Sequence, residues 1–362
     1  MRRKSLIVVL VLLAVSLLTS FSAGQTKLCR KVNPSATVMT RNLDAGSDFG
    51  YVLAAVNDPN STELDLLMAI TNTYSEMIAS NIPGRADGIA TEILLHRPDL
   101  IGLQEVTTLR TGPYGEPAST VVVDGLQSLL DALAKKGLHY SAVAVQTNAV
   151  VDLPAFDASG SLITVGFTDY DAILARTDLP TSQFKVSNVA MEHFSVYLPF
   201  TVAGQTIPFL RGWISLEVNQ RGRQYKFVTS HLETFSPDVQ AAQANELVMG
   251  PLVSTLPIVL ASDLNSDAYQ PSWDNGPAIQ ILEAAGLVEV WSKLYPRSPG
   301  LTWPLFAEDP TGSSTLRQRI DLILTNGSGL KNRSIQRTGM FAWKGVYSSD
   351  HTGVLGQFEL LP

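Results

Sequence analysis

The sequence has little of what marks a disulfide-stabilised or polyanion-binding protein. Cys29 is the only cysteine among 362 residues, so no disulfide can form within the chain and the core must supply the stability. Charged residues make up 16% of the chain, and the formal net charge is −7. Because no basic stripe follows the first four residues, weak non-specific affinity for nucleic acid is expected. The 45% hydrophobic content instead indicates a globular domain with a large core.

Long hydrophobic runs are also scarce, with one exception at the start of the chain. Basic residues at positions 2–4 precede an apolar run over 6–18, and small residues follow at 22–24. This pattern predicts a signal peptide over 1–24, with an uncleaved anchor as the alternative, and hence a secreted or extracytoplasmic protein. Its removal would bring the net charge to about −10. No other run approaches the length of a membrane span.

A linker is expected over 25–35, and a single domain over 36–362. Apolar runs predict buried strands, and periodic segments predict helices. The strands are expected at 36–43, 98–106, 169–176, 210–218, 224–233, 257–265 and 317–325. The helices are expected at 60–80, 85–97, 124–136, 237–250 and 276–285, with Asn60 and Glu63 as a capping box for the first. A last strand follows His351 and alternates like an edge strand, while 110–120 and 296–313 are predicted to be loops. The order favours mixed sheets with helices outside.

Polar residues interrupt these apolar strands at six places, mostly at a carboxyl end or margin. A single one of them is more often a helix cap, a turn residue or half of an ion pair. Six in one chain are harder to explain in that way, because buried carboxylates must be paired or hold a cation. The residues are Asn42, Gln104, Glu105, His231, Glu233, Asp263, Asn265, Asp321, Asp350 and His351.

This set of side chains favours metal-assisted hydrolysis. Asn, Asp and Glu supply hard oxygen ligands, which suit Mg²⁺, Mn²⁺ or Ca²⁺ better than a structural zinc. Two histidines beside such a cation are suited to hydrolysis of a phosphate ester. The sequence contains neither a phosphate-binding G-x-x-x-x-G-K-[ST] loop nor a G-x-S-x-G nucleophile motif. Covalent serine or cysteine catalysis therefore lacks the residues that it needs.

The ordered motifs resemble the endonuclease/exonuclease/phosphatase superfamily, which includes deoxyribonuclease I, abasic-site endonucleases, neutral sphingomyelinases and inositol-polyphosphate 5-phosphatases. The resemblance covers roughly residues 36–360 and implies an α/β (α+β) four-layer sandwich, with two mixed β-sheets packed face to face and helices outside. It also implies a metal-dependent phosphoesterase. The motifs are TRNL (40–43), LIGLQEV (100–106), LRGW (210–213), TSHLE (229–233), ASDLNSD (261–267), RQRIDLIL (317–324) and SSDH (348–351).

The resemblance also implies roles for individual residues. The metal ion, Mg²⁺ or alternatively Mn²⁺ or Ca²⁺, would bind Asn42 and Glu105, with Asp350 helping on the far side. Asp263 and Asn265 would orient the attacking water and the phosphate.

The two histidines would act on the reacting phosphate. His351 would lie at the scissile phosphate with Asp321 as its carboxylate partner. His231 would be the second histidine of the deoxyribonuclease and sphingomyelinase branches. The acidic residue that supports this histidine is expected at Asp169, with Asp171 as the neighbouring alternative.

Four further features qualify the resemblance. Arg211 stands where the family has an arginine close to the phosphate, and a surface arginine is the alternative. Ser262 replaces the usual glycine before D-x-N. The 62 residues between Asn42 and Glu105 exceed what compact nucleases need, so the 60–80 helix is expected to lie beside the site. The tryptophan and Cys-Asp-Arg signatures of the 5-phosphatases are absent, which disfavours that branch.

The sequence therefore predicts a secreted, divalent-metal-dependent phosphodiesterase, expected to be a monomer, in which water attacks the phosphodiester without a covalent intermediate. A nuclease is the first expectation for the substrate class. The alternatives are a sphingomyelinase-like phospholipase C, a phosphomonoesterase and, least favoured, a non-catalytic binding module. A lipid substrate would need an exposed apolar hairpin such as 120–126 or 194–200, and Trp303 is a candidate substrate contact.

Overall fold

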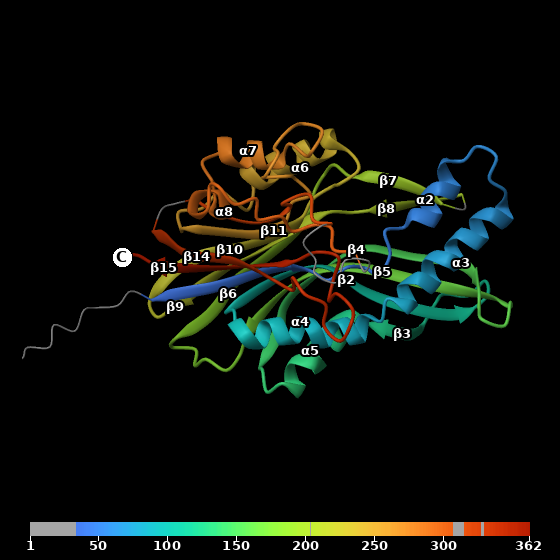
Figure 1. Ribbon diagram of the computed structural model, residues 1–362, viewed down its shortest axis with the longest axis horizontal. Coiled ribbons are helices and arrows are strands. Elements are labelled where there is room, and N and C mark those ends of the chain that lie inside the picture. Colours follow the sequence, from blue (N-terminus) through green and yellow to red (C-terminus); the bar gives the residue numbers. More distant parts are fainter. Residues whose placement is uncertain (1–33, 203, 307–314, 327–328) are drawn as a thin grey trace, which may run out of the picture. The chain divides into compact units, whose positions relative to one another are not determined.

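The computed structural model describes residues 34–202, 204–306, 315–326 and 329–362 (Figure 1). The signal peptide predicted over 1–24 and nearly all of the linker predicted over 25–35 lie outside these residues. Residues 34–362 form one compact unit. None of its described helices combines the length and the hydropathy that crossing a membrane requires.

The first large sheet has seven strands in the order β14-β15-β1-β2-β5-β4, with β3 paired to β2. β1 and β2 run parallel, and the other pairs are antiparallel. The strands are β1 Ser35–Asn42, β2 Leu100–Pro113, β3 Thr120–Asp124, β4 Tyr140–Phe156, β5 Leu162–Arg176, β14 Leu330–Thr338 and β15 Gly353–Leu360. Two expectations are corrected here. The loop at 110–120 is shorter than predicted, since β2 continues to Pro113 and β3 begins at Thr120. β15 is an inner strand between β14 and β1, not an edge strand.

The second large sheet has six strands in the order β12-β13-β11-β10-β9-β6. β10 and β11 run parallel, so this sheet is also mixed. Its strands are β6 Phe184–His193, β9 Gly212–Gln220, β10 Arg223–His231, β11 Ile258–Asp263, β12 Val288–Glu289 and β13 Asp321–Thr325. A separate two-stranded hairpin consists of β7 Leu198–Val202 and β8 Gln205–Phe209.

Helices cover the outer faces of the two sheets, which gives four layers (Figure 1). α4 Ile82–His96 and α5 Gly125–Lys135 pack on the seven-stranded sheet through Ile93 and Leu129. α6 Pro237–Met249 and α7 Ala278–Ala284 pack on the six-stranded sheet. A third apolar cluster, which includes Phe358 and Phe227, fills the space between the sheets. The two-sheet sandwich predicted from the sequence is confirmed.

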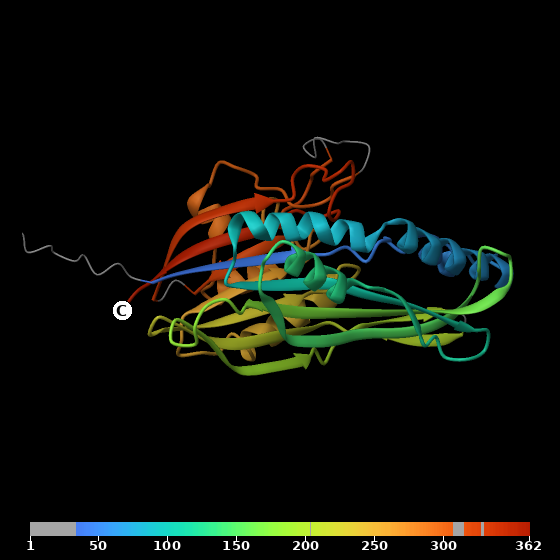
Figure 2. The ribbon, with the colours of Figure 1, turned by 90° about the horizontal axis from the view of Figure 1, so that it is seen from below.

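The segment between β1 and β2 holds two helices ahead of α4. α2 Gly50–Asn57 was not predicted. α3 Glu63–Ala79 begins three residues later than the expected range of 60–80, because Thr62 rather than Asn60 caps it. Thr62 and Asp65 form the capping box, which satisfies backbone donors of the first turn. Figures 1 and 2 place α3 at the same end of the domain as the far ends of β4 and β5, where the β7–β8 hairpin also lies. A short α8, Val290–Leu294, follows β12.

Candidate active site

Three neighbouring strands of the six-stranded sheet place a polar residue at the same edge of the sheet. His231 ends β10, Asp263 ends the parallel strand β11, and the two are paired in register. Asp321 begins the antiparallel strand β13 directly opposite Asp263. Since the carboxyl end of β11 meets the amino end of β13, three chemically active side chains lie side by side. All three are buried.

The seven-stranded sheet contributes residues at the carboxyl ends of β1 and β2. Asn42 is in register with Gln104, whose amide donates to Thr229 Oγ1 in the other sheet at 3.0 Å. An irregularity in the β2–β5 pairing follows, and Glu105 adopts a left-handed backbone with φ 53°. Such a conformation is unfavourable for a residue with a side chain, and it clusters at functional sites. It turns Glu105 away from the regular strand and toward Asn42.

The amide of Asn42 joins the two halves of the site. Its Nδ2 donates to Glu105 Oε1 at 2.8 Å and to Asp263 Oδ2 at 3.0 Å. Its Oδ1 accepts from the backbone N–H of Asp44 at 2.8 Å. Asn42 therefore bridges two carboxylates from different sheets, and it would have to turn its amide over to offer its oxygen to a cation.

His351 and Asp321 form a buried pair, as the family resemblance implied. His351 Nδ1 lies 2.8 Å from Asp321 Oδ2 and 3.8 Å from Asp263 Oδ2. Burial alone would lower the pKa of His351, but the surrounding carboxylates of Asp321, Asp350 and Asp263 hold it well above its usual value. The ring is therefore an imidazolium at neutral pH and can donate a proton from Nε2.

His231 is in the opposite charge state, because its partner is an arginine. Arg211 Nη1 lies 2.7 Å from His231 Nδ1, and a guanidinium can only donate, so Nδ1 accepts and Nε2 carries the hydrogen. Burial, then the positive charges of Arg211 and His351, hold the pKa of His231 well below its usual value. His231 Nε2 faces Asp263 Oδ2 at 3.6 Å and Glu105 Oε1 at 4.0 Å. The neutral ring thus points a donor into the site.

Arg211 is buried, so the alternative of a surface arginine does not hold. It occupies the His231 Nδ1 position that we expected Asp169 to hold. Asp169 accepts instead from Asn148 at 3.1 Å. Burial raises the pKa of Asp169 to about 7, an effect that the nearby Arg211 charge reduces. The pKa of Asp171 is raised well above its usual value by burial and by Asp169. An arginine–histidine contact therefore stands where an acid–histidine pair was expected.

The D-x-N motif places its two residues next to each other at the end of β11. Asp263 Oδ1 accepts from the backbone N–H of Asn265 at 2.9 Å, and Asn265 has a left-handed φ of 47°. The amide nitrogen of Asn265 donates to the Leu232 carbonyl at 3.0 Å. Burial, followed by repulsion from Asp321, raises the pKa of Asp263 to about 7. Ser262, in place of glycine, accepts from the backbone N–H of Ser230 at 3.0 Å and so joins β11 to β10.

Asp350 faces the same centre from the loop before β15. Its Oδ2 accepts from the Trp303 indole at 3.0 Å, so Trp303 holds a candidate metal ligand. Its pKa is raised to about 7, first by desolvation and then by the neighbouring carboxylates of Asp44 and Glu105, although the His351 charge opposes this. A divalent cation would relieve the repulsion among these carboxylates. The donor set is entirely oxygen and fits a hard cation held by Glu105 and Asp350.

Asp263, Asp321 and His351 also lie close enough together to share a metal ion, since their ligand atoms lie within 4.8 Å of one another. The 2.8 Å contact between His351 and Asp321 occupies the nitrogen that such an ion would need. The hydrogen-bond arrangement therefore favours an ion pair between His351 and Asp321 at this position and a cation nearer Glu105.

Two residues that the sequence analysis did not select hold the site in place. Arg41, fully buried in β1, donates to the His351 carbonyl at 2.6 Å and forms an ion pair with Glu92 of α4 at 3.0 Å. Glu92 also accepts from the Thr338 hydroxyl at 2.7 Å. Arg85 donates to the Leu43 carbonyl at 2.6 Å and fixes the loop after β1. An arginine inside a strand expected to be buried was the available signal for Arg41.

Comparisons with known proteins agree with this geometry. Residues 72–351 match the Endonuclease/Exonuclease/phosphatase family. No curated protein sequence matches the chain.

Several solved structures share the fold. A family protein from Leptotrichia buccalis has a TM-score of 0.54 at 16% identity and covers 90% of this chain and 100% of its own. D. rerio TDP2 complexed with a single-strand DNA product has a TM-score of 0.53 at 16% identity, covering 90% and 98%. The human nocturnin catalytic domain with bound sulfate has a TM-score of 0.50 at 16% identity, covering 91% and 96%. The chain is thus a metal-dependent hydrolase of phosphate ester bonds that belongs to the Endonuclease/Exonuclease/phosphatase family.

Proposed function

We propose that the protein is a Mg²⁺-dependent phosphodiesterase in which water attacks phosphorus directly. The observation that carries this proposal is the convergence of Asn42 and Glu105 from one sheet with Asp263 from the other, linked by hydrogen bonds of 2.8 and 3.0 Å. A neutral His231 and a charged His351 flank this centre. Two histidines in opposite protonation states suit a reaction that needs both a neutral donor and an acid.

Each side chain has a distinct task in this proposal. When bound, the cation polarises the phosphoryl oxygens. Asp263, held by the backbone of Asn265, orients the attacking water and accepts its proton. His231 donates a hydrogen bond from Nε2 to a non-bridging oxygen. As the ester bond between phosphorus and the leaving oxygen breaks, His351 donates its Nε2 proton to that oxygen, and Asp321 stabilises the imidazolium beforehand.

Hydrolysis of bis-(p-nitrophenyl) phosphate tests this proposal. EDTA should abolish turnover and Mg²⁺ should restore it. Asp263→Asn, Glu105→Gln and His351→Gln should each lower kcat by about 10²-fold or more, in line with the loss of general acid–base or metal chemistry. Glu116→Gln, at an exposed position, is the control. Wild-type rates in all three site variants would refute the role assignment.

The structural similarity raises nucleic acid as one substrate class, so DNA belongs among the substrates to be tested. D. rerio TDP2, which shares the fold, was crystallised with a single-strand DNA product. The acidic net charge of −7 argues for a limited contact with polyanions. Single-stranded and plasmid DNA should therefore be compared with sphingomyelin and with a phosphomonoester under identical Mg²⁺ concentrations.

Export and oligomeric state are also part of the proposal. The basic n-region and apolar run of residues 1–24 support cleavage by signal peptidase and release outside the cytoplasm. Mass spectrometry of the protein recovered from the culture medium should give an N-terminus close to Gly24. Light scattering coupled to gel filtration should give a monomer. A protein retained in the cytoplasm at full length would refute the export proposal.

A further inference from the structure

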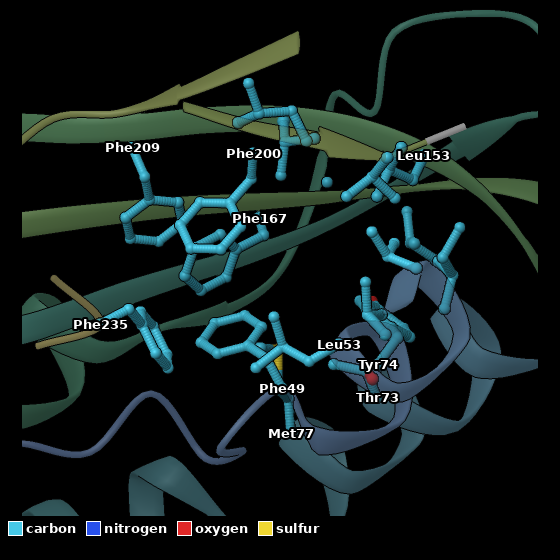
Figure 3. Close-up of a pocket in the computed structure, with 18 of the residues that line it drawn as sticks. Phe49, Leu53, Thr73, Tyr74, Met77, Leu153, Phe167, Phe200, Phe209 and Phe235 are labelled. Atoms are coloured by element: carbon cyan, nitrogen blue, oxygen red, sulfur yellow. The ribbon is translucent and has the colours of Figure 1, made fainter. Parts of the chain in front are cut away.

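An apolar cavity lies between the helices that precede α4 and the β7–β8 hairpin, above the extended ends of β4 and β5. Figure 3 shows Phe49, Phe167, Phe200, Phe209 and Phe235 gathered at one side, with aliphatic side chains such as Leu153 at the other. Its volume is about 160 Å³. An engineered cavity of about 150 Å³ with an apolar lining binds benzene, so this one has space for a hydrocarbon of roughly six carbons.

The cavity adjoins the catalytic centre through Arg211. This residue lines the cavity and at the same time hydrogen-bonds His231 Nδ1 at 2.7 Å. Its guanidinium also lies 5.7 Å from the centre of the Phe209 ring. Glu233, two residues after His231, lines the same wall. An ester bound at the two histidines would therefore have one substituent within reach of the apolar cavity.

Phe235 marks the solvent side of the cavity. Its side chain is 56% exposed, although it contacts Phe200 edge-to-face with ring centres 5.8 Å apart. A large aromatic residue that remains half in solvent beside a catalytic centre is typical of an apolar binding surface. The walls come from α2, α3 and the hairpin, so the insert between Asn42 and Glu105 forms much of this cavity.

A second pocket of about 120 Å³ next to the site is polar. It is lined by Asn265, Asp274 and Trp303, among others. The segment after Glu233 separates the two pockets, since Thr234 lines the polar one and Phe235 the apolar one. A phosphodiester has two ester substituents, and this site offers them two unlike environments.

We infer that the cavity binds the hydrocarbon chain of a lipid phosphodiester, while the polar pocket receives the headgroup. This inference rests on the proposed phosphodiesterase function, since the chain must be attached to the reacting phosphate. A nucleobase is a poor occupant, because an apolar cavity would leave the polar groups on its edge without hydrogen-bond partners. An alkyl chain has no such groups and gains from every buried methylene.

Alkyl p-nitrophenyl phosphodiesters test the inference below their micellar concentrations, in Mg²⁺. Water attacks phosphorus, the bond to the aryl oxygen breaks, and p-nitrophenolate and an alkyl phosphate are released. Because a fully buried methylene contributes roughly fourfold to binding, kcat/KM should rise at least about tenfold from the methyl to the hexyl ester and then level off.

Cavity variants provide the matched comparison. Leu53 and Leu153 both line the cavity, and Leu53→Trp and Leu153→Trp should fill the space and remove the chain-length dependence. Leu53→Ala should enlarge it and move the optimum to a longer chain. Leu95→Trp, at a position 73% exposed on α4, is the control and should behave as wild type. Calorimetric binding of hexyl phosphate should weaken at least about tenfold in the filled variants, independently of turnover.

The outcomes separate the two proposals. A flat chain-length profile with metal-dependent turnover of every ester would overturn the cavity inference and leave the phosphodiesterase function intact. No metal-dependent turnover of any ester would overturn the function itself. Faster cleavage of single-stranded DNA than of the hexyl ester, with both slowed equally by Leu53→Trp, would also refute a hydrocarbon site.

Discussion

Among single side chains, Arg211 acts together with burial to keep the His231 imidazole neutral. A guanidinium 2.7 Å from His231 Nδ1 opposes protonation of the ring and fixes the hydrogen on Nε2. We expect ¹⁵N NMR at pH 6 to show a neutral His231 in the Nε2–H tautomer. Arg211→Met should raise the pKa of His231, because it removes the nearby positive charge. Arg211→Lys, which keeps the charge, is the control, and a protonated His231 in the wild type at pH 6 would contradict this assignment.

Asp171 gives a second prediction, about stability rather than turnover. It is buried, and neither carboxylate oxygen has a well-formed hydrogen bond among the described residues. Its pKa in the folded protein lies well above the unfolded value, since burial and Asp169 outweigh Asn148 and Arg211. The folded state therefore favours the proton, and stability falls as pH rises above about 4.

Asp171→Asn replaces the ionisable group with a neutral one of the same shape. We expect it to raise the melting temperature at pH 8, by an amount equivalent to about 1–3 kcal/mol, and to change it little at pH 4. Differential scanning calorimetry at both pH values measures this. Asp131→Asn, on the exposed face of α5, should have little effect at either pH. An equal shift at pH 4 and pH 8 would exclude the titration of Asp171 as the cause.

Polar groups that interrupt apolar strands were the sequence signal for the candidate site residues. His351 and Asp321 were expected to pair, and they lie 2.8 Å apart. The environment of His231 was not predictable in the same way. Arg211 reaches His231 Nδ1 by extending its side chain across the pair of strands β9 and β10. The spacing of residues along the chain does not encode the direction of that side chain. Family resemblance placed Asp169 there instead.

On the scale of secondary-structure elements, Glu92 connects α4 to the loop that carries His351. It pairs with Arg41, which in turn holds the His351 carbonyl, and it accepts from Thr338. Glu92→Ala would leave Arg41 buried without its partner, and it should destabilise the fold by about 3–5 kcal/mol. Urea denaturation followed by circular dichroism measures this.

A double variant isolates the ion pair. Replacement of both partners, Arg41→Met with Glu92→Leu, should recover much of the lost stability, because no charge is then left unpaired. It should not recover wild-type kcat, since the His351 carbonyl loses its donor. Full recovery of both would show that Arg41 has no positioning role.

The buried central strands could be predicted from the sequence, whereas the strands at the outer end of the domain could not. β11 is buried along its whole length and β10 over its second half, and both were recognised from the apolar runs that they contain. β4 and the β7–β8 hairpin carry mixed residues, because they line the outer end of the domain where one face contacts helices or solvent. The start of α3 offered two possible capping boxes, Asn60 with Glu63 and Thr62 with Asp65. The second one forms, since the Thr62 hydroxyl accepts from the Asp65 N–H at 3.2 Å.

Considered as a whole molecule, the site exists only because two sheets pack with their parallel strand ends together. Asn42 and Asp263 are 221 positions apart in the chain and 3.0 Å apart in space. Motif order could suggest that they meet, but the geometry depends on the core between the sheets and on Gln104, which bridges them. The sequence contains no local signal for such a long-range contact.

Metal binding should therefore be linked to protonation of the whole site. The pKa values of Asp263 and Asp350 lie at about 7, because burial and neighbouring carboxylates disfavour their charged forms. Below pH 7 a cation must displace the protons of these two carboxyl groups, whereas above pH 7 it binds carboxylates that are already ionised. Mg²⁺ affinity should thus rise by about tenfold or more per pH unit between 5.5 and 7, then level off.

Thermal shift and calorimetry can measure this linkage together. At a Mg²⁺ concentration of about 100 Kd, the folded state should gain about 2.7 kcal/mol, and EDTA should reverse the gain. Titrations at pH 6 in two buffers of unlike ionisation enthalpy should reveal proton release, which should be nearly absent at pH 8.5. Glu105→Gln should remove the stabilisation at both pH values, whereas the exposed Glu116→Gln should retain it. Equal affinity at pH 6 and pH 8.5 would mean that the clustered carboxylates are already ionised, and that the cation does not bind among them.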